Sequence, residues 1–226
     1  MNHGAAARDR AFGFYYPGDL DRLEHLGAEL INIDTLNDTH LPEIDGLFIG
    51  GGFPERYGAE LQQNSSLRWQ IRQAIDAGLP AYAECAGLMY LSQSLRWQGQ
   101  SFEMVGVIPA RTIMHERPQG RGYVELVENN QHPWPHPPAS GTVMHAHEFH
   151  YSMLEGLPAD WHHAYQITRG HGISGSEDGL VYKNLLASYT HLRHTRKTPW
   201  IDRFLSFVGN CKTSPLTTRP ANGASA

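Results

Sequence analysis

The sequence has few cysteines, no long apolar run and no excess of positive charge, and each absence excludes a class of protein. A net charge of -5 gives no reason to expect nucleic acid or an anionic membrane as a partner. Apolar runs such as 46–49 are far shorter than the roughly 20 residues of a membrane-spanning helix. Residues 1–10 are small and polar, unlike a signal peptide. We therefore expect a soluble, cytoplasmic chain.

The two cysteines are Cys85 and Cys211. One disulfide between them is possible on paper. The lack of a signal peptide favours a reducing compartment instead, where thiols stay free and a lone cysteine is either packed or reactive.

Histidine is abundant, with 14 residues, which raises metal binding as a hypothesis. The strongest pattern is His145-x-His147-x-x-His150. If this segment is a strand, His145 and His147 share one face and His150 faces the other, which is poor geometry for a chelate. We therefore predict no metal site.

Alternating strand and helix signals predict an α/β fold. Apolar residues at helical spacing indicate helices over 19–30, 67–77, 86–95 and 200–208, with Asp19 or Asp21 as the first cap. Strands are predicted over 11–16, 29–33, 44–49, 79–84, 104–108, 122–126, 142–151, 164–168 and 180–189, and a proline-rich loop over 129–140. This order predicts a mostly parallel sheet with helices on both faces, in three layers.

The predicted domain runs from residue 11 to 210. Residues 1–10 lack the β-branched run that opens a parallel sheet, so we expect a residual or truncated segment there. Residues 211–226 are small and polar, and we expect a disordered tail.

Cys85 stands where an apolar strand gives way to a helix, with Gly87 two residues on. A nucleophile on such a turn projects from the carboxyl edge of the sheet, and the N–H groups of the following helix point at an oxyanion and favour a thiolate. A buried structural cysteine is the alternative. The glycines at 50–52 end the preceding strand and would supply further N–H donors, although without the Gly-Lys-Ser/Thr of a phosphate loop.

A thiol nucleophile needs a histidine to take its proton, and that histidine need not be close in sequence. His150 and His191 both end predicted strands. Spacing alone does not choose between them.

Five motifs in one order make a family resemblance visible. They are Phe14-Tyr15-Tyr16-Pro17, Gly50-Gly51-Gly52-Phe53-Pro54-Glu55, residues 83–91 around Cys85, residues 147–152 and residues 187–192. Together they resemble the C-terminal glutamine amidotransferase domain of the cobyrinic acid a,c-diamide synthase family, over about residues 11–208. This resemblance implies a class I glutamine amidotransferase-like fold and hydrolysis of glutamine through a γ-glutamyl thioester on Cys85.

The resemblance also implies roles for other residues. His191 matches the family's base, and His150 matches a position in the glutamine pocket. The oxyanion donors would be the backbone N–H groups of Gly51 or Gly52 and of Ala86.

Two positions depart from the family pattern. Ala86 stands where the family usually has glycine, which narrows the pocket but leaves the N–H. Arg193 stands where many related amidotransferases have a glutamate that completes a triad, so the resemblance implies a Cys-His dyad. Glu148 is a candidate to orient a histidine.

Synthases of this family carry a further domain that binds ATP and Mg²⁺ and activates a tetrapyrrole carboxylate. The sequence has no Gly-x-x-x-x-Gly-Lys-Ser/Thr motif. We therefore expect a truncated product, a split subunit or an excised domain, with no cofactor of its own and a synthetase domain or subunit as partner. Residues 178–186 also resemble sirohaem-amidating relatives, so a corrinoid of cobalamin biosynthesis and sirohaem both stay open as acceptors.

Two rival functions remain. A catalytically silent binding module on the same fold is favoured by the reduced N-terminal segment. A cysteine hydrolase acting on another small amide or ester would use the same nucleophile.

Overall fold

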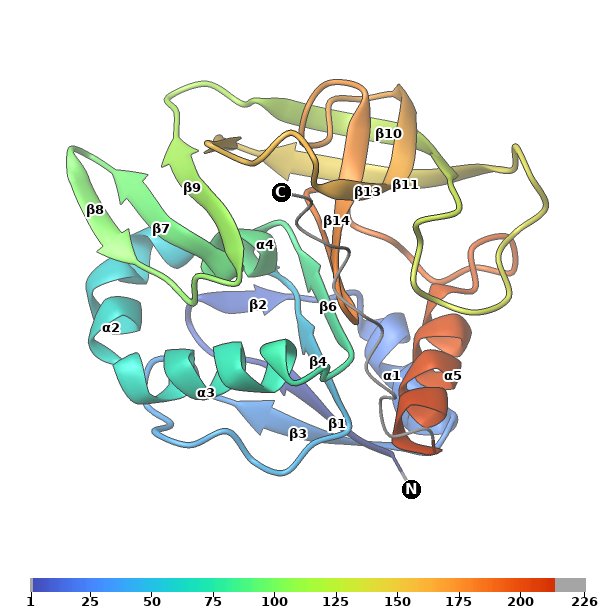
Figure 1. The fold of residues 1–226 in the computed structure, drawn as a ribbon, viewed down its shortest axis with the longest axis horizontal. Helices are drawn as coiled ribbons and strands as arrows, with labels where there is room; N and C mark the ends of the chain where they lie inside the picture. Colours follow the sequence, from blue (N-terminus) through green and yellow to red (C-terminus); the bar gives the residue numbers. More distant parts are fainter. Residues whose placement is uncertain (1, 214–226) are drawn as a thin grey trace, which may run out of the picture.

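The computed structural model describes residues 2–213, and a nine-stranded sheet organises this part of the chain (Figure 1). The strand order is β11-β10-β13-β14-β15-β6-β4-β1-β3. The strands are β1 (Asn2–Ala7), β3 (Ala28–Ile33), β4 (Gly46–Ile49), β6 (Ala81–Glu84), β10 (Gly120–Glu128), β11 (Val143–His150), β13 (His162–Arg169), β14 (Glu177–Tyr182) and β15 (Leu185–Ser188).

The sheet has two halves of different character. From β3 to β15 every pairing is parallel. From β15 to β11 every pairing is antiparallel. Because parallel strands end at the same edge, the parallel half brings the ends of β4, β6 and β15 together, and the candidate site lies there.

Helices cover both faces of the parallel half (Figure 1). On one face lie α1 (Pro17–His25) and α5 (Trp200–Thr213), and on the other α2 (Gly58–Gln63), α3 (Ser65–Asp76) and α4 (Ala86–Leu91). Phe48 and Tyr82 belong to a core cluster with Phe204 of α5, whereas Ile49 joins a cluster with Ile71 of α3. This alternation along β4 is what a strand covered on both sides requires. The predicted α/β class is confirmed.

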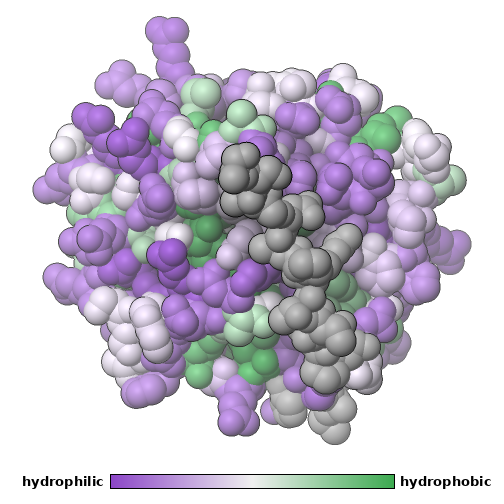
Figure 2. Space-filling model, in the orientation of Figure 1, coloured by the Kyte–Doolittle hydropathy of each residue, from purple (hydrophilic) through white to green (hydrophobic). Residues whose placement is uncertain are grey.

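A smaller sheet, β12-β9-β7-β8, flanks the large one, and two short strands pair near the site. The strands of the smaller sheet are β7 (Ser92–Trp97), β8 (Gln100–Glu103), β9 (Ile108–Met114) and β12 (Ser152–Glu155). The short pair is β2 (Phe12–Phe14) with β5 (Gly51–Gly52), and the 3-10 turn η1 (Pro54–Tyr57) follows β5. Figure 2 shows a mostly hydrophilic face broken by small hydrophobic areas.

The N-terminal residues form a strand that the sequence pattern did not predict. Although residues 1–10 lack the β-branched run that is typical of a parallel strand, residues 2–7 form strand β1, which pairs in parallel with both β3 and β4. Ala5, Ala6 and Ala7 are all buried. Strand formation here follows from pairing and burial on both faces, which override the weak β propensity of alanine.

Two predicted helices end early. The first ends at His25 rather than Leu30, and Gly27 follows with a φ of 85°. The helix after Cys85 ends at Leu91, and the chain turns into β7, where the Ser92 hydroxyl bonds back to the Met89 carbonyl at 2.7 Å. A serine hydroxyl that satisfies a last-turn carbonyl favours such an ending.

Several smaller predictions also change. Tyr16 occupies the N-cap position of α1 without a side-chain hydrogen bond, and Asp19 is buried, where it accepts hydrogen bonds from His194 N and Trp200 Nε1. Residues 104–107 form no strand, and α5 continues to Thr213, so the first three residues of the predicted tail are helical. The rest of that tail, 214–226, lies outside the described residues.

Both cysteines are free, so the disulfide possible on paper does not form. Among the helices of residues 2–213, none combines the length and the apolar character needed to cross a membrane.

The role of β1 can be tested with a buried charge. Ala6 is fully buried in β1, so Ala6→Asp is expected to destabilise the protein by on the order of 4 kcal/mol or more, or to abolish folding. Ala59→Asp makes the same change at an exposed position of α2 and should cost little. Denaturant unfolding followed by circular dichroism measures both. Equal stability of the two variants would contradict a central place for β1.

Candidate active site

The nucleophile candidate holds an unusual backbone conformation. Cys85 has a φ of 48° and a ψ of -96° at the junction of β6 and α4. A non-glycine residue with positive φ is strained by on the order of 1–3 kcal/mol and is typical of functional sites. The surrounding backbone fixes it: Cys85 N donates to Ser188 O at 2.7 Å, and Met89 N donates to Cys85 O at 3.0 Å.

The glycine loop and the cysteine turn are joined directly. Gly87 N donates to Gly50 O at 3.1 Å, and a Cβ on Gly87 would lie 2.2 Å from the carbonyl oxygen of Ile49. A Cβ on Gly52 would lie 1.9 Å from Ala11 O. Only glycine allows these approaches, so Gly87 lets the Cys85 turn lie against the end of β4, and Gly52 lets the glycine loop lie against Ala11.

His191 reaches the same place from the end of β15. Its N–H donates to His147 O at 2.7 Å and its carbonyl accepts from His147 N at 3.2 Å, which ties it to β11. The buried Asp178 carboxylate accepts from Tyr189 N at 3.0 Å and from Thr190 N at 2.9 Å. The turn that carries His191 is therefore fixed on both sides.

A cavity of about 490 Å³ brings these residues together. This is the size range of small-molecule sites, roughly 300–1,000 Å³. Its lining consists of Gly13, Phe14, Tyr15, Tyr16, Gly52, Phe53, Glu84, Cys85, His147, Phe149 and His191. Phe14, Phe53 and Phe149 are about half exposed and give the cavity an aromatic rim.

The charge state of His191 is set by its neighbours. Burial alone would lower the pKa of His191, but interactions with Cys85 and Glu84 outweigh burial and raise the pKa to about 10. Glu84 Oε2 lies 3.3 Å from His191 Nδ1. An imidazolium beside Cys85 is the partner that a thiolate nucleophile requires.

The structure places the predicted oxyanion residues around the same turn. Gly52 lines the cavity, and a Cβ on Gly51 would lie 2.7 Å from His191 Cε1, so the Gly51 backbone borders the His191 ring. Ala86 is fully buried as the first residue of α4, directly after Cys85.

His150 lies elsewhere. His147 and Phe149 line the cavity, and His150 is buried on the opposite face of β11, stacked on Tyr189 with ring centroids 3.9 Å apart. Its Nδ1 is 2.9 Å from Ser152 O. The resemblance placed His150 in the glutamine pocket, and strand alternation instead turns its side chain away from that pocket.

The side chains of the histidine-rich strand alternate between its two faces, as the sequence spacing predicts. In β11, His145 and His147 are on one face and His150 is buried on the other. Within residues 2–213 no group of three or more His, Cys, Asp or Glu side chains is arranged to hold a metal ion.

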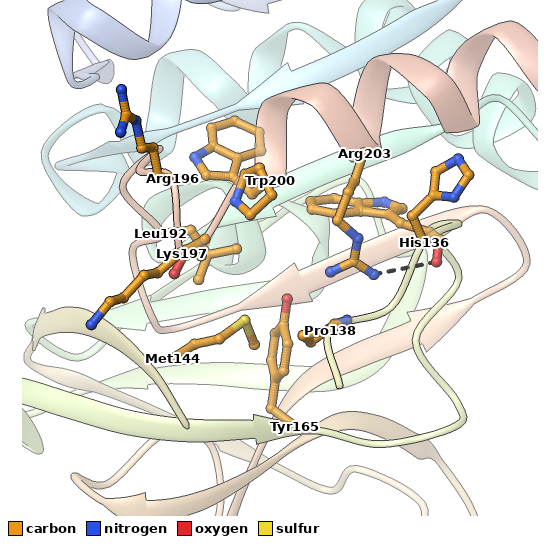
Figure 3. Close-up of a pocket in the computed structure, with 12 residues that line it drawn as sticks. His136, Pro138, Met144, Tyr165, Leu192, Arg196, Lys197, Trp200 and Arg203 are labelled. Atoms are coloured by element: carbon orange, nitrogen blue, oxygen red, sulfur yellow. Dashed lines mark hydrogen bonds between the residues drawn. The ribbon is translucent and has the colours of Figure 1, made fainter. Parts of the chain in front are cut away.

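A second cavity, of about 220 Å³, lies between α5 and the antiparallel strands (Figure 3). Met144, Tyr165, Leu192 and Trp200 form apolar parts of its wall, and the Arg203 side chain lies on the side of His136. The Arg203 guanidinium is bonded to both oxygens of Glu128, at 2.7 and 2.8 Å, so its charge is already paired. Neither a cysteine nor a serine is among the described residues that line this cavity.

Sequence reasoning missed Glu84, Asp178, His147 and Phe149. Glu84 sits in an apolar strand directly before Cys85, and a charged residue in a buried strand was the signal available. The position of Phe149 was visible inside one of the five motifs. The sequence did not show that the Phe149 side chain lines the cavity, because the direction of that side chain depends on the register of β11.

Most of the chain matches a known protein family. The model of the CobB/CobQ-like glutamine amidotransferase domain matches residues 5–199. The chain belongs to this family. The resemblance predicted from the five motifs is confirmed.

Curated relatives share the same stretch. A cobyrinate a,c-diamide synthase from Magnetococcus marinus is 44% identical over 194 residues, covering 86% of this chain and 41% of that protein. Another, from Archaeoglobus fulgidus, is 43% identical over 187 residues, covering 82% and 39%. The chain therefore spans about two fifths of the length of these relatives.

Solved structures agree on the fold. PurLQS from Thermotoga maritima superposes with a TM-score of 0.65 at 14% identity, covering 93% of this chain and 99% of that chain. A structure described as a glutamine amidotransferase gives a TM-score of 0.62 at 15% identity, covering 91% and 98%. The class I glutamine amidotransferase-like fold is confirmed.

The contact between Gly51 and His191 predicts a selective loss of activity. A methyl group on Gly51 must displace the His191 ring, so Gly51→Ala should lower the rate at which glutamine-analogue electrophiles label Cys85 by about tenfold or more. Gly18→Ala, where nothing lies within 4 Å of the new Cβ, is the control. Mass spectrometry over time measures labelling. Unchanged labelling in Gly51→Ala would place His191 outside the reaction.

The raised pKa of His191 predicts a dependence of stability on pH. Its folded value of about 10 lies above the ordinary 6.5, so the stability from protonating His191 is complete below about pH 6.5 and is lost as pH rises toward 10. The difference in unfolding free energy between wild type and His191→Gln should shrink over that range. In the Cys85→Ala background the trend should weaken, because one of the two groups that raise the pKa is gone. A difference that stays constant up to pH 10 would contradict the charge assignment.

Proposed function

We propose that this chain hydrolyses glutamine to glutamate and ammonia through a thioester on Cys85. The observation that supports this most is the meeting of the strained Cys85 turn, His191 and the glycine loop in one cavity. Membership of a glutamine amidotransferase family makes glutamine the expected donor.

The reaction follows from these positions. The Cys85 sulfur attacks the side-chain amide carbon, and the protonated His191 gives its proton to the leaving nitrogen, which departs as ammonia. His191 then accepts a proton from water, whose oxygen attacks the thioester carbon and releases glutamate and the thiol. We assign stabilisation of the two oxyanions to the backbone N–H groups of Gly51 or Gly52 and of Ala86.

We further propose that a synthetase part consumes the ammonia. The relatives named cobyrinate a,c-diamide synthase are more than twice as long as the stretch matched here. The exposed aromatic rim of Phe14, Phe53 and Phe149 beside the cavity suits contact with such a partner, because exposed apolar groups gathered at a site favour protein contacts. ATP and Mg²⁺ belong to that partner in this proposal.

We propose a tetrapyrrole carboxylate as the acceptor, within cobalamin biosynthesis. The names of the curated relatives favour a corrinoid over sirohaem. Two free cysteines are in keeping with the reducing cytoplasm that we propose as its location.

The proposal predicts the effect of removing each reacting group. Cys85→Ala should abolish glutamine hydrolysis, and His191→Ala should slow it by about 10²- to 10⁴-fold, as loss of a general base does. Ammonia release, measured with and without a co-expressed synthetase subunit, tests this. Cys211→Ala removes the other cysteine and should leave the rate unchanged.

Labelling by a glutamine-analogue electrophile gives a second readout. Modification should map to Cys85 and disappear in Cys85→Ser. Label that persists in Cys85→Ser would disprove the thioester. No hydrolysis and no label, even with the synthetase present, would favour a silent binding module.

A further inference from the structure

We propose that Glu84 is a positioning residue for His191. In this arrangement the Glu84 carboxylate holds the His191 ring, and the ring serves Cys85, which directly follows Glu84 in the sequence. This inference rests on the glutaminase function proposed above. It replaces the simple Cys-His dyad that the family resemblance implies.

The Glu84 carboxylate is buried and held from two sides. It is 3% exposed, and its Oε1 accepts from Tyr82 OH at 2.6 Å and from Leu192 N at 2.9 Å. These bonds leave Oε2 facing His191 Nδ1 at 3.3 Å. The carboxylate is therefore fixed by donors that take no part in the reaction, and it presents one oxygen to the ring.

The strained turn explains how consecutive residues reach one histidine. Neighbouring residues of a strand point to opposite faces. The positive φ of Cys85 breaks that alternation, and both Glu84 and Cys85 line the cavity with His191. The strain at Cys85 thus places the acid and the nucleophile around the same ring.

An imidazole held in this way has a defined tautomer. A proton on Nδ1 donated to Glu84 leaves Nε2 as the ring nitrogen available to Cys85. The same arrangement stabilises the imidazolium that forms when the thiol loses its proton.

The other acidic and basic groups nearby are engaged elsewhere. Glu148 accepts from His171 N and Gly172 N, both at 2.8 Å, and faces His150. Arg193 stands where related enzymes carry their glutamate, and it lies over the Tyr16 ring at 5.7 Å. Asp19 bonds to His194 N and Trp200 Nε1.

The charges that bear on His191 come from Cys85 and Glu84. Around Glu84 the titratable groups are Tyr15, Tyr16, Asp19, Tyr82 and Tyr165, and burial raises the pKa of each. The tyrosines thus stay neutral at physiological pH. Glu84 is the carboxylate that hydrogen-bonds the His191 ring.

Glu84→Gln is the decisive variant. Tyr82 OH and Leu192 N still need an acceptor, so the amide oxygen stays with them and the amide NH₂ faces His191 Nδ1. Nδ1 must then accept, the proton moves to Nε2, and the ring can no longer take a proton from Cys85 there. We expect kcat for glutamine hydrolysis to fall by about 10²- to 10⁴-fold with little change in KM.

Glu148→Gln is the matched control, because it makes the same change at a second buried carboxylate that does not contact His191. It should change kcat far less. A Glu84→Gln enzyme with wild-type kcat, or a Glu148→Gln enzyme that loses more activity, would overturn the assignment of Glu84.

Nitrogen-15 NMR of the His191 ring gives a test that needs no turnover. Because the pKa of wild-type His191 is about 10, the neutral ring is observed in the Cys85→Ala background, where one of the two groups that raise this pKa is gone. There the neutral ring should carry its proton on Nδ1, and on Nε2 when Glu84→Gln is added. A ring protonated on Nε2 in Cys85→Ala with Glu84 present would overturn the inference. If the wild type hydrolyses no glutamine even with a synthetase present, the proposed function fails, whereas the tautomer still decides the role of Glu84.

Discussion

The candidate site depends on one backbone constraint, the positive φ of Cys85 between β6 and α4. Its energetic cost is offset by hydrogen bonds from Cys85 N to Ser188 O and from Gly87 N to Gly50 O. The first bond joins Cys85 to β15, the strand that leads to His191. The second joins the turn after Cys85 to the glycine loop. Hydrogen bonds at Cys85 and at Gly87, two residues on, therefore connect three separate chain segments.

Much of the fold was visible in the sequence because its strands and helices carry strong apolar patterns. The helix over 65–76 and the strands around 46–49 and 81–84 follow those patterns closely. Strand β1 was missed because alanine has little intrinsic preference for strands, and only pairing with β3 and β4 places it in the sheet. Helix α4 ended early because tertiary pairing of β7 overrides helical spacing.

The site was predictable to a different degree. Local sequence showed that Cys85 follows a strand and that glycines end the strand before it. Spacing left His150 and His191 equivalent, and only the family resemblance chose His191. The facing of β11, which turns Phe149 toward the cavity and His150 away, depends on long-range register that no local pattern encodes.

The two halves of the large sheet contribute different parts of the candidate site. The parallel half carries Cys85, Glu84 and the glycine loop, and its last strand, β15, leads to His191. The outermost strand, β11, contributes His147 and Phe149 as a wall. In evolutionary terms, side-chain substitutions on β11 can reshape what enters the cavity and what docks beside it, while Cys85, Glu84 and His191, which lie outside β11, stay unchanged.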